Sequence, residues 1–271
     1  MSDSLLSSEQ VYLDANATTP VLPCIAQVVS HTMQICFGNP SSPHITGIQA
    51  KHLLEQTREN ARTVIGAKEG NILFTSGATE GIQTAVVSTL INAKTHKIDN
   101  PVLLYGATEH KAVPNTLKHW NDVLGINAKI LAIPVDSEGI LDLTFIAEHI
   151  PNALMICTMA VNNETGVYQD LDAIEQTIRF LNPDVSWMVD CVQALGKKQL
   201  NLSATTIDYA PFSGHKLYAP KGIGFLYIRA GSAYTPFIAG GGQESGMRSG
   251  TENLPGIAGL NKLFSLLLDR S

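Results

Sequence analysis

Residues 71–80 read NILFTSGATE, an apolar run that ends at a Ser-Gly turn and leads into helix-forming residues up to Ala93. The same unit recurs along the chain, so we expect further strands at 102–105, 129–135, 154–159, 187–190, 209–213 and 224–228, and helices at 113–123, 143–149 and 171–180. Nearly continuous apolar strands that alternate with helices predict an α/β fold, with a mostly parallel sheet covered on both faces.

Composition narrows the classes of function. The 271 residues are 44% hydrophobic and carry a net charge of −6 without a basic stripe, which argues against nucleic-acid binding. No apolar run approaches the ~18–20 residues of a membrane-spanning helix, and the N-terminus lacks the features of a secretory signal. The eight histidines show no metal-ligand spacing, so no metal site is predicted. Four scattered cysteines favour free thiols in a reducing compartment, so we expect a cytoplasmic protein without membrane contact.

Polar clusters follow five of the predicted strands. In an open parallel sheet, ligands gather at the carboxyl ends of the strands. The turn at 75–80 places backbone N–H groups and the Thr79 hydroxyl at a helix N-terminus, which suits a phosphate, although an ordinary capped turn fits that hexapeptide about equally well. The other clusters contain His110, Asn163, Asp190 with Gln193, and the SGHK turn at 213–216.

Two of these residues suggest a cofactor. Lys216 is presented on a tight Ser-Gly-His turn, and Asp190 ends an apolar strand. A lysine can join the aldehyde of pyridoxal phosphate (PLP) as a Schiff base, and a carboxylate can keep the pyridine nitrogen protonated so that the ring accepts electrons. A Gly turn followed by a basic residue is by itself usually a plain loop. The order of all five clusters makes PLP the expected cofactor.

These motifs closely resemble the class V aminotransferase-like enzymes of PLP fold type I, and within them the cysteine desulfurases of the NifS/IscS type. The resemblance runs from YLDANATTP (12–20) to the end of the chain, through FGNPSS (37–42), TSGATE (75–80), TEHKAV (108–113), VNNETG (161–166), SGHK (213–216), PKGIG (220–224), GGGQE (240–244) and MRSGT (247–251). It implies an N-terminal segment at 1–20, a PLP-binding large domain at 21–255, and a C-terminal helix at 256–271 that would lead into a small domain largely missing here.

The resemblance implies a role for each residue around the cofactor ring. Lys216 would carry the cofactor and move protons at the substrate Cα, and Asp190 would pair with the pyridinium nitrogen. Gln193 would donate a hydrogen bond to the ring hydroxyl oxygen. His110 would stack on the ring and act as an acid or base, as histidine side chains commonly do. Asn163 would contact the ring or the substrate.

The resemblance also implies how the phosphate is held. Ala78, Thr79, Ser213 and His215 would bind it within one subunit. Thr251 would reach the phosphate of a neighbouring subunit, so a two-fold homodimer that shares two sites is expected.

The implied reaction removes sulfur from L-cysteine to give L-alanine, with a sulfur-acceptor protein as partner and a role in iron–sulfur cluster assembly. Another class V reaction, by an aminotransferase or a selenocysteine lyase, is an alternative, and so is a non-catalytic PLP-binding protein. The family's nucleophilic cysteine and substrate-binding arginine belong to the small domain, so we expect cofactor binding with very slow desulfuration by this chain. Cys191, where the family usually has alanine, is expected to be a small core residue rather than a surrogate thiol.

The C-terminal segment carries an apolar stripe. Leu260, Leu263, Phe264 and Leu267 recur at the spacing of one helix face. Because exposing such a stripe to water is unfavourable by about 25 cal/mol per Å², we expect the helix either to fold back on the large domain or to be buried in a dimer. The pocket should then be more open than in a full-length desulfurase.

Overall fold

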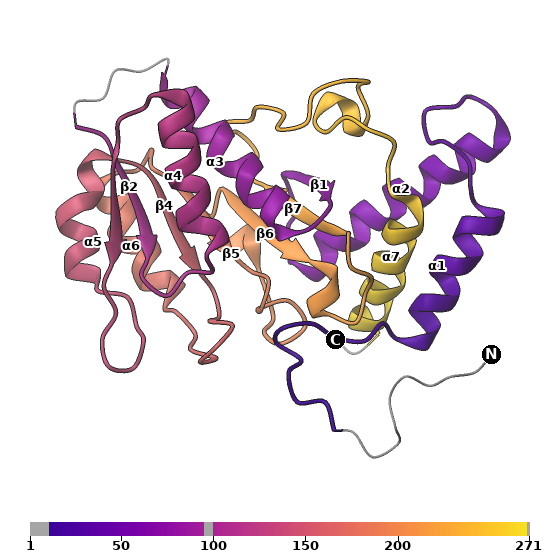
Figure 1. The fold of residues 1–271 in the computed structure, drawn as a ribbon, viewed down its shortest axis with the longest axis horizontal. Coiled ribbons are helices and arrows are strands. Elements are labelled where there is room, and N and C mark those ends of the chain that lie inside the picture. The colour runs from indigo at the N-terminus through magenta and orange to yellow at the C-terminus, as the bar shows by residue number, and fades with distance from the viewer. Residues whose placement is uncertain (1–10, 95–99, 270–271) are drawn as a thin grey trace.

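A computed structural model describes residues 11–94 and 100–269 (Figure 1). Its centre is a seven-stranded sheet in the order β1-β7-β6-β5-β4-β2-β3. The strands are β1 (Asn71–Thr75), β2 (Val102–Gly106), β3 (Lys129–Ile133), β4 (Ala153–Met159), β5 (Ser186–Asp190), β6 (Tyr209–Ser213) and β7 (Gly224–Ile228). The expected α/β fold is confirmed, and every expected strand is present.

The strand directions bring the carboxyl ends of six strands to one edge of the sheet. Strands β3, β2, β4, β5 and β6 are parallel, and β7 lies antiparallel between β6 and β1. Only β7 therefore runs in the opposite direction, which agrees with a mostly parallel sheet. β3 ends two residues earlier than expected, because Pro134 has no N–H to donate to the ladder.

Helices cover both faces of the sheet. One face is covered by α3 (Ala78–Lys94) and α4 (Ala112–Leu124). The other is covered by α5 (Leu143–His149) and α6 (Leu171–Leu181), together with α1 (Pro23–Ile35), α2 (Ile45–Val64) and α7 (Leu254–Leu268). Leu73 packs into the first of these cores and its neighbour Phe74 into the second. Burial on both faces explains why the strands read as continuous apolar runs.

The C-terminal stripe folds back on the large domain. Helix α7 packs against α1 and α2, as Figure 1 shows. Leu260, Leu263 and Phe264 are buried, Leu267 is partly buried, and the Phe264 ring meets the Phe225 ring edge-on at 5.5 Å. The helix begins at Leu254, two residues before the expected start, because the Asn253 side chain caps it by accepting a hydrogen bond from the Gly256 N–H.

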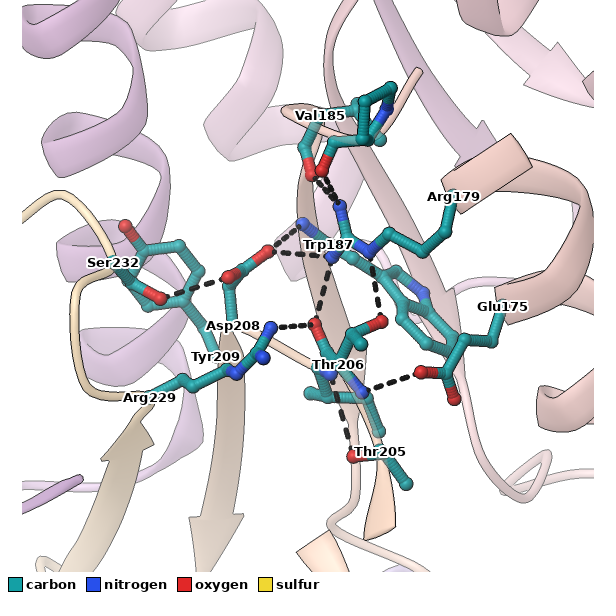
Figure 2. A network of polar contacts seen from close by, with 12 residues as sticks. Glu175, Arg179, Val185, Trp187, Thr205, Thr206, Asp208, Tyr209, Arg229 and Ser232 are labelled. Atoms are coloured by element: carbon teal, nitrogen blue, oxygen red, sulfur yellow. Dashed lines mark hydrogen bonds and ion pairs between the residues drawn. The ribbon is translucent and has the colours of Figure 1, made fainter. Parts of the chain in front are cut away.

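A polar network holds β5 beside β6, where the ladder itself contains a single register pair (Figure 2). Arg179, from α6, donates to the Thr206 carbonyl at 2.8 Å, to the Val185 carbonyl at 2.7 Å and to the Asp208 carboxylate at 3.1 Å. Asp208 also accepts a hydrogen bond from the Trp187 backbone N–H at 2.8 Å. We call this network the β5–β6 seam, because it joins the strand that ends at Asp190 to the strand that leads to the Lys216 turn.

Candidate active site

A cavity of about 530 Å³ opens at the carboxyl edge of the sheet. Nine of the ten predicted site residues line it: Ala78, Thr79, His110, Asn163, Asp190, Gln193, Ser213, His215 and Lys216. Thr251 does not. It lies in an exposed loop between Gly250 and Glu252, which both line a neighbouring small hollow that Thr251 itself does not line. Residues that are far apart in the sequence therefore meet because the five strands that they follow, β1, β2, β4, β5 and β6, end at this edge.

One end of the cavity is the turn between β1 and α3. The helix begins at Ala78, so its unpaired N–H groups lie at the cavity wall. The Ser76 N–H is held by the Glu80 carboxylate at 2.8 Å, and the Thr75 hydroxyl donates to the Gly77 carbonyl at 3.0 Å. These bonds fix the turn from behind and leave the helix N-terminus free for an anion.

Strand β7 lies between β6, which leads to the lysine turn, and the β1–α3 turn. A Cβ at Gly224 would lie 2.4 Å from the Phe212 carbonyl oxygen and 2.9 Å from the Gly77 Cα. Only glycine therefore allows β7 to pass between β6 and the β1–α3 turn. This close approach brings Ser213, at the end of β6, to the same cavity wall as Gly77.

Lys216 closes the short helix η3 (Gly214–Lys216), and its ammonium lies at the cavity. Its Nζ donates to the Asn16 carbonyl at 2.6 Å. Burial lowers the pKa of Lys216, and the charges of Asp190 and Asp14 offset part of that effect. A lowered pKa increases the fraction of neutral amine, which is the form that attacks an aldehyde.

Asp190 supplies a buried carboxyl group to the cavity. It ends β5 and is 6% exposed, and its Oδ1 accepts a hydrogen bond from the Val192 N–H at 2.9 Å. Burial raises the pKa of Asp190, and the Val192 N–H, His110 and Lys216 counter this only in part. Within the described ranges, no basic side chain forms an ion pair with Asp190. A cationic ring nitrogen in the cavity would supply the missing partner.

His110 is presented in one tautomer. It follows β2, and its Nδ1 accepts a hydrogen bond from the Ala112 N–H at 3.2 Å. An Nδ1 that accepts must be unprotonated, so the ring proton of the neutral imidazole is on Nε2. The side chain can therefore donate a hydrogen bond, or a proton, from Nε2.

The N-terminal segment forms part of the site, and the sequence did not single out its central residue. The Asn16 carbonyl accepts from Gln193 Nε2 at 2.9 Å as well as from Lys216, and the Asn16 side chain accepts from Lys197 at 2.9 Å. The Thr19 N–H donates to the His215 carbonyl at 2.9 Å. A second hollow of about 780 Å³ lies on this side, lined by residues 13–17 together with Lys216 and His110. The motif at 12–20 was the available signal, but its spacing does not reveal these contacts.

An ion pair links the β1–α3 turn to the loop that carries Thr251. Arg248 donates to the Glu80 carboxylate at 2.9 and 3.3 Å. Burial by itself raises the pKa of Glu80, but hydrogen bonds from Arg248 and from the Ser76 N–H outweigh it and lower this pKa overall. Glu80 therefore holds its turn as a carboxylate.

The described ranges also bear on three other possibilities: a reactive thiol, a metal site and a membrane-spanning helix. Cys157 and Cys191 are fully buried, and burial raises the pKa of both thiols, so Cys191 is the inert core residue that was expected. Residues 11–94 and 100–269 contain no cluster of three or more potential metal ligands. Within the same ranges, no helix is both long and apolar enough to cross a membrane.

The sequence of this chain is similar to those of known proteins. The aminotransferase class-V family model matches residues 11–270. The chain belongs to the aminotransferase class-V family. A cysteine desulfurase of Nostoc sp. is 39% identical over 261 residues, which cover 95% of this chain and 62% of that protein. The cysteine desulfurase IscS of Rickettsia prowazekii is 41% identical over 254 residues, or 92% of this chain and 60% of that protein.

Solved structures agree. A NifS-like protein superposes with a TM-score of 0.89 at 35% identity, covering 96% of this chain and 70% of the other. SspA in complex with cysteine superposes with a TM-score of 0.85 at 32% identity, covering 94% and 72%. The resemblance to class V enzymes and the fold type I large domain are confirmed. The enzymes of this family are PLP-dependent. This chain spans about three fifths of the length of its Nostoc and Rickettsia relatives.

Proposed function

We propose that this chain is the PLP-binding large domain of a cysteine desulfurase, with residues 21–255 as the domain and α7 as its C-terminal helix. One observation carries the proposal. Asp190, a buried carboxylate without an ion-pair partner among the described residues, lines the same cavity as Lys216, whose pKa is lowered. The first group suits a protonated ring nitrogen and the second suits an aldehyde. Both chemical demands of PLP are thus matched by residues at one sheet edge.

The ring end of the cavity has a residue for each contact. When bound, PLP supplies an electron-poor ring that stabilises negative charge at the substrate Cα. Asp190 would keep the ring nitrogen protonated, and Gln193 would donate to the ring hydroxyl oxygen. Lys216 would hold the cofactor and then move the proton at Cα. His110 would lie over the ring with its Nε2 proton available, and Asn163 would contact the ring or the substrate.

The phosphate end follows from the helix N-terminus. Ala78 and Thr79 would bind the phosphate through N–H groups and the Thr79 hydroxyl, and Ser213 and His215 would bind it from the lysine turn. Thr251 would reach the phosphate held by a second copy of the chain in a homodimer. Its position outside the cavity lining supports a role beyond its own subunit.

The proposed substrate is L-cysteine, and the product is L-alanine. The names of the Nostoc and Rickettsia relatives and the SspA complex with cysteine support this choice. The hollow beside residues 13–17 gives the amino acid a place next to Lys216. The proposed role is the supply of sulfur to an acceptor protein, in iron–sulfur cluster assembly.

The acceptor thiol is proposed to come from outside the described residues. Cys157 and Cys191 are buried, and Cys24 and Cys36 lie on α1 and at its end, away from the cavity lining. All four cysteines are free thiols, which fits a reducing, cytoplasmic location. With L-cysteine alone, the purified chain should therefore release sulfur very slowly.

Cofactor attachment is the first test. The chain is incubated with PLP, reduced with borohydride, digested and mapped by mass spectrometry. The pyridoxyl group is expected on Lys216. Attachment at Lys111 or Lys221 instead, or none at all, would refute the assignment. A Lys216→Ala variant should give no adduct and should melt within a few degrees of the wild type.

The reaction is tested on the PLP-loaded protein, with L-cysteine and a dithiol reductant as electron donor. Alanine and sulfide in equal amounts, formed slowly, are expected. Amino transfer to a keto acid would identify an aminotransferase, and selenide release from selenocysteine alone would identify a lyase. PLP binding with neither alanine nor sulfide would leave a non-catalytic PLP-binding protein. Cysteine turnover at the rate of a full-length desulfurase would contradict the absence of a reactive thiol and would direct attention to Cys191.

A further inference from the structure

Lys197 contacts the candidate site without lining its cavity. It follows β5 and the turn that contains Gln193, and its ammonium meets two acceptors. One is the Gln193 Oε1 atom, and the other is the Asn16 Oδ1 atom at 2.9 Å. The site motifs singled out by the sequence do not include this residue.

The contact decides which way the Gln193 amide faces. An ammonium has only donors, so the atom it touches must be the amide oxygen. With Oε1 on Lys197, the amide nitrogen faces the Asn16 carbonyl, to which it donates at 2.9 Å. Reversing the amide would set its NH₂ against the ammonium and its oxygen against the Asn16 carbonyl. Both contacts would then be repulsive, so Lys197 selects the orientation that offers a donor at the cavity.

Lys197 also fixes the N-terminal segment. The Asn16 carbonyl accepts from Lys216 and from Gln193, and an occupant of the cavity that takes either donor would remove that bond. The bond from Lys197 to the Asn16 side chain lies outside the cavity lining and would persist. It would keep residues 12–19 in place whether or not the cavity is filled. Burial and the charge of Lys216 lower the pKa of Lys197, which agrees with two ammonium groups converging on one residue.

We propose that Lys197 is a positioning residue, which orients Gln193 as a hydrogen-bond donor toward the cofactor ring oxygen and anchors the N-terminal segment through Asn16. The first half rests on the proposed function, because it needs PLP as the occupant. The second half concerns the chain alone and holds without a cofactor.

The test compares Lys197→Met with Lys197→Arg and Lys198→Met. Lys198 is the matched control, since it is the adjacent lysine and lies over the Tyr168 ring at 5.4 Å, away from Gln193. PLP dissociation constants are measured by absorbance titration. Lys197→Met should weaken PLP binding about tenfold, the usual effect of losing a hydrogen bond to a charged group. Lys197→Arg should recover most of that loss, and Lys198→Met should match the wild type.

Three further readouts separate positioning from general damage. Inorganic phosphate binding should be unchanged in Lys197→Met, because the phosphate end of the cavity does not contact Lys197. In a Gln193→Ala background, the same substitution should lose most of its effect on PLP, because the two residues act through one contact. In the cofactor-free protein, hydrogen exchange of the peptide 12–20 should be faster in Lys197→Met than in Lys198→Met.

Each outcome decides a separate statement. Equal PLP affinity in Lys197→Met and wild type would overturn the orientation role while leaving the proposed function intact. Equal weakening of phosphate binding would overturn it as well, since the damage would then be general. Unchanged exchange of the peptide 12–20 would overturn the anchoring role. A wild-type chain that binds no PLP would refute the proposed function and with it the orientation role, whereas the exchange experiment would still decide the anchoring role.

Discussion

At the residue scale, the site combines groups whose pKa values are displaced by burial. The pKa of Asp190 is raised and that of Lys216 is lowered, and both shifts have desolvation as their largest cause. Each charged form is therefore less favourable in the folded protein than in water. A ligand that brings a positive ring nitrogen and an aldehyde relieves both, so the same residues that cost stability without a ligand favour binding.

Replacing Asp190 by asparagine should separate function from stability. The neutral amide cannot hold the ring proton by charge, so Cα-proton exchange on a bound amino acid should fall about 100-fold. The cofactor-free variant should be at least as stable as the wild type at neutral pH, because a carboxylate with a raised pKa is removed. Exchange is measured by NMR and stability by urea unfolding, with the exposed Asp172→Asn as control. Unchanged Cα-proton exchange in Asp190→Asn would show that the Asp190 carboxylate does not act on the cofactor ring.

Glu109 offers a pH-dependent prediction beside the site. Its Oε2 is buried without a hydrogen-bond partner in the described part of the chain, and burial followed by the charge of Asp190 raises its pKa well above 4.5. The native state then binds this proton more tightly than the unfolded state. Its contribution to stability is therefore complete below the unfolded pKa and is lost as the pH rises through the raised native pKa.

A Glu109→Gln variant cannot titrate at this position. Its unfolding free energy should therefore fall less than that of the wild type between about pH 5 and about pH 8. Urea unfolding of the cofactor-free proteins at both pH values checks this, with the exposed Glu148→Gln as control. Parallel pH profiles for Glu109→Gln and the wild type would show that Glu109 does not titrate in this range.

At the element scale, the β1–α3 turn depends on a partner from the far end of the chain. Glu80 holds the Ser76 N–H, and Arg248 holds Glu80 from 168 residues away. The arginine belongs to the loop that also carries Thr251. An ion pair thus joins two segments: the turn proposed to bind the phosphate in its own subunit, and the loop proposed to reach the phosphate in a second subunit.

An Arg248→Met variant should leave the Glu80 carboxylate partly buried and unpaired. We expect a loss of about 1–3 kcal/mol in stability and a several-fold weaker binding of both PLP and inorganic phosphate, since the helix N-terminus would no longer be fixed. Isothermal titration and urea unfolding provide the two measurements. Arg62→Met is the control, because its pair with Glu59 lies on the surface of α2. An equal effect in the two variants would contradict the role of the ion pair.

At the scale of the whole molecule, the β5–β6 seam joins the two strands that carry the two halves of the site. Asp190 lies on one side of it and Lys216 follows the strand on the other. The ladder has one register pair here, with backbone bonds from the Asp208 N–H to the Trp187 carbonyl and from the Cys191 N–H to the Pro211 carbonyl on either side of it, and the Arg179 and Asp208 side chains add to this connection. Stability and site geometry are therefore linked through a network at the opposite ends of these strands.

An Arg179→Met variant should destabilise the protein by about 2–3 kcal/mol, because several charged hydrogen bonds are lost together and Asp208 is left without its ion pair. Arg229→Met is the graded control, since Arg229 makes a single bond of 3.3 Å to the Thr206 carbonyl, and it should cost less than about 1 kcal/mol. Thermal and urea unfolding measure both. A loss in Arg179→Met no larger than in Arg229→Met would show that the ladder alone holds the seam.

Local sequence signals were sufficient for the strands and for most of the candidate site, but they did not predict the helices α1 and α2. Apolar runs and turn residues predicted each strand to within about two residues, and the polar clusters at strand ends, together with the motifs that resemble the family, predicted nine residues that line one cavity. These features depend on neighbours within a few positions, so they can be inferred along the chain. The apolar spacing of Leu260, Leu263 and Phe264 likewise predicted a buried helix face.

Only the tertiary structure decided which distant residues meet. Four features have no periodic signal in the sequence. They are the reversed direction of β7, the bond from Lys216 to Asn16 across 200 positions, the Glu80–Arg248 pair and the two acceptors of Lys197. Each depends on the order in which the strands assemble and on a side chain that reaches between elements. Local propensity describes how a segment folds, whereas the packing of whole layers determines which polar groups become partners.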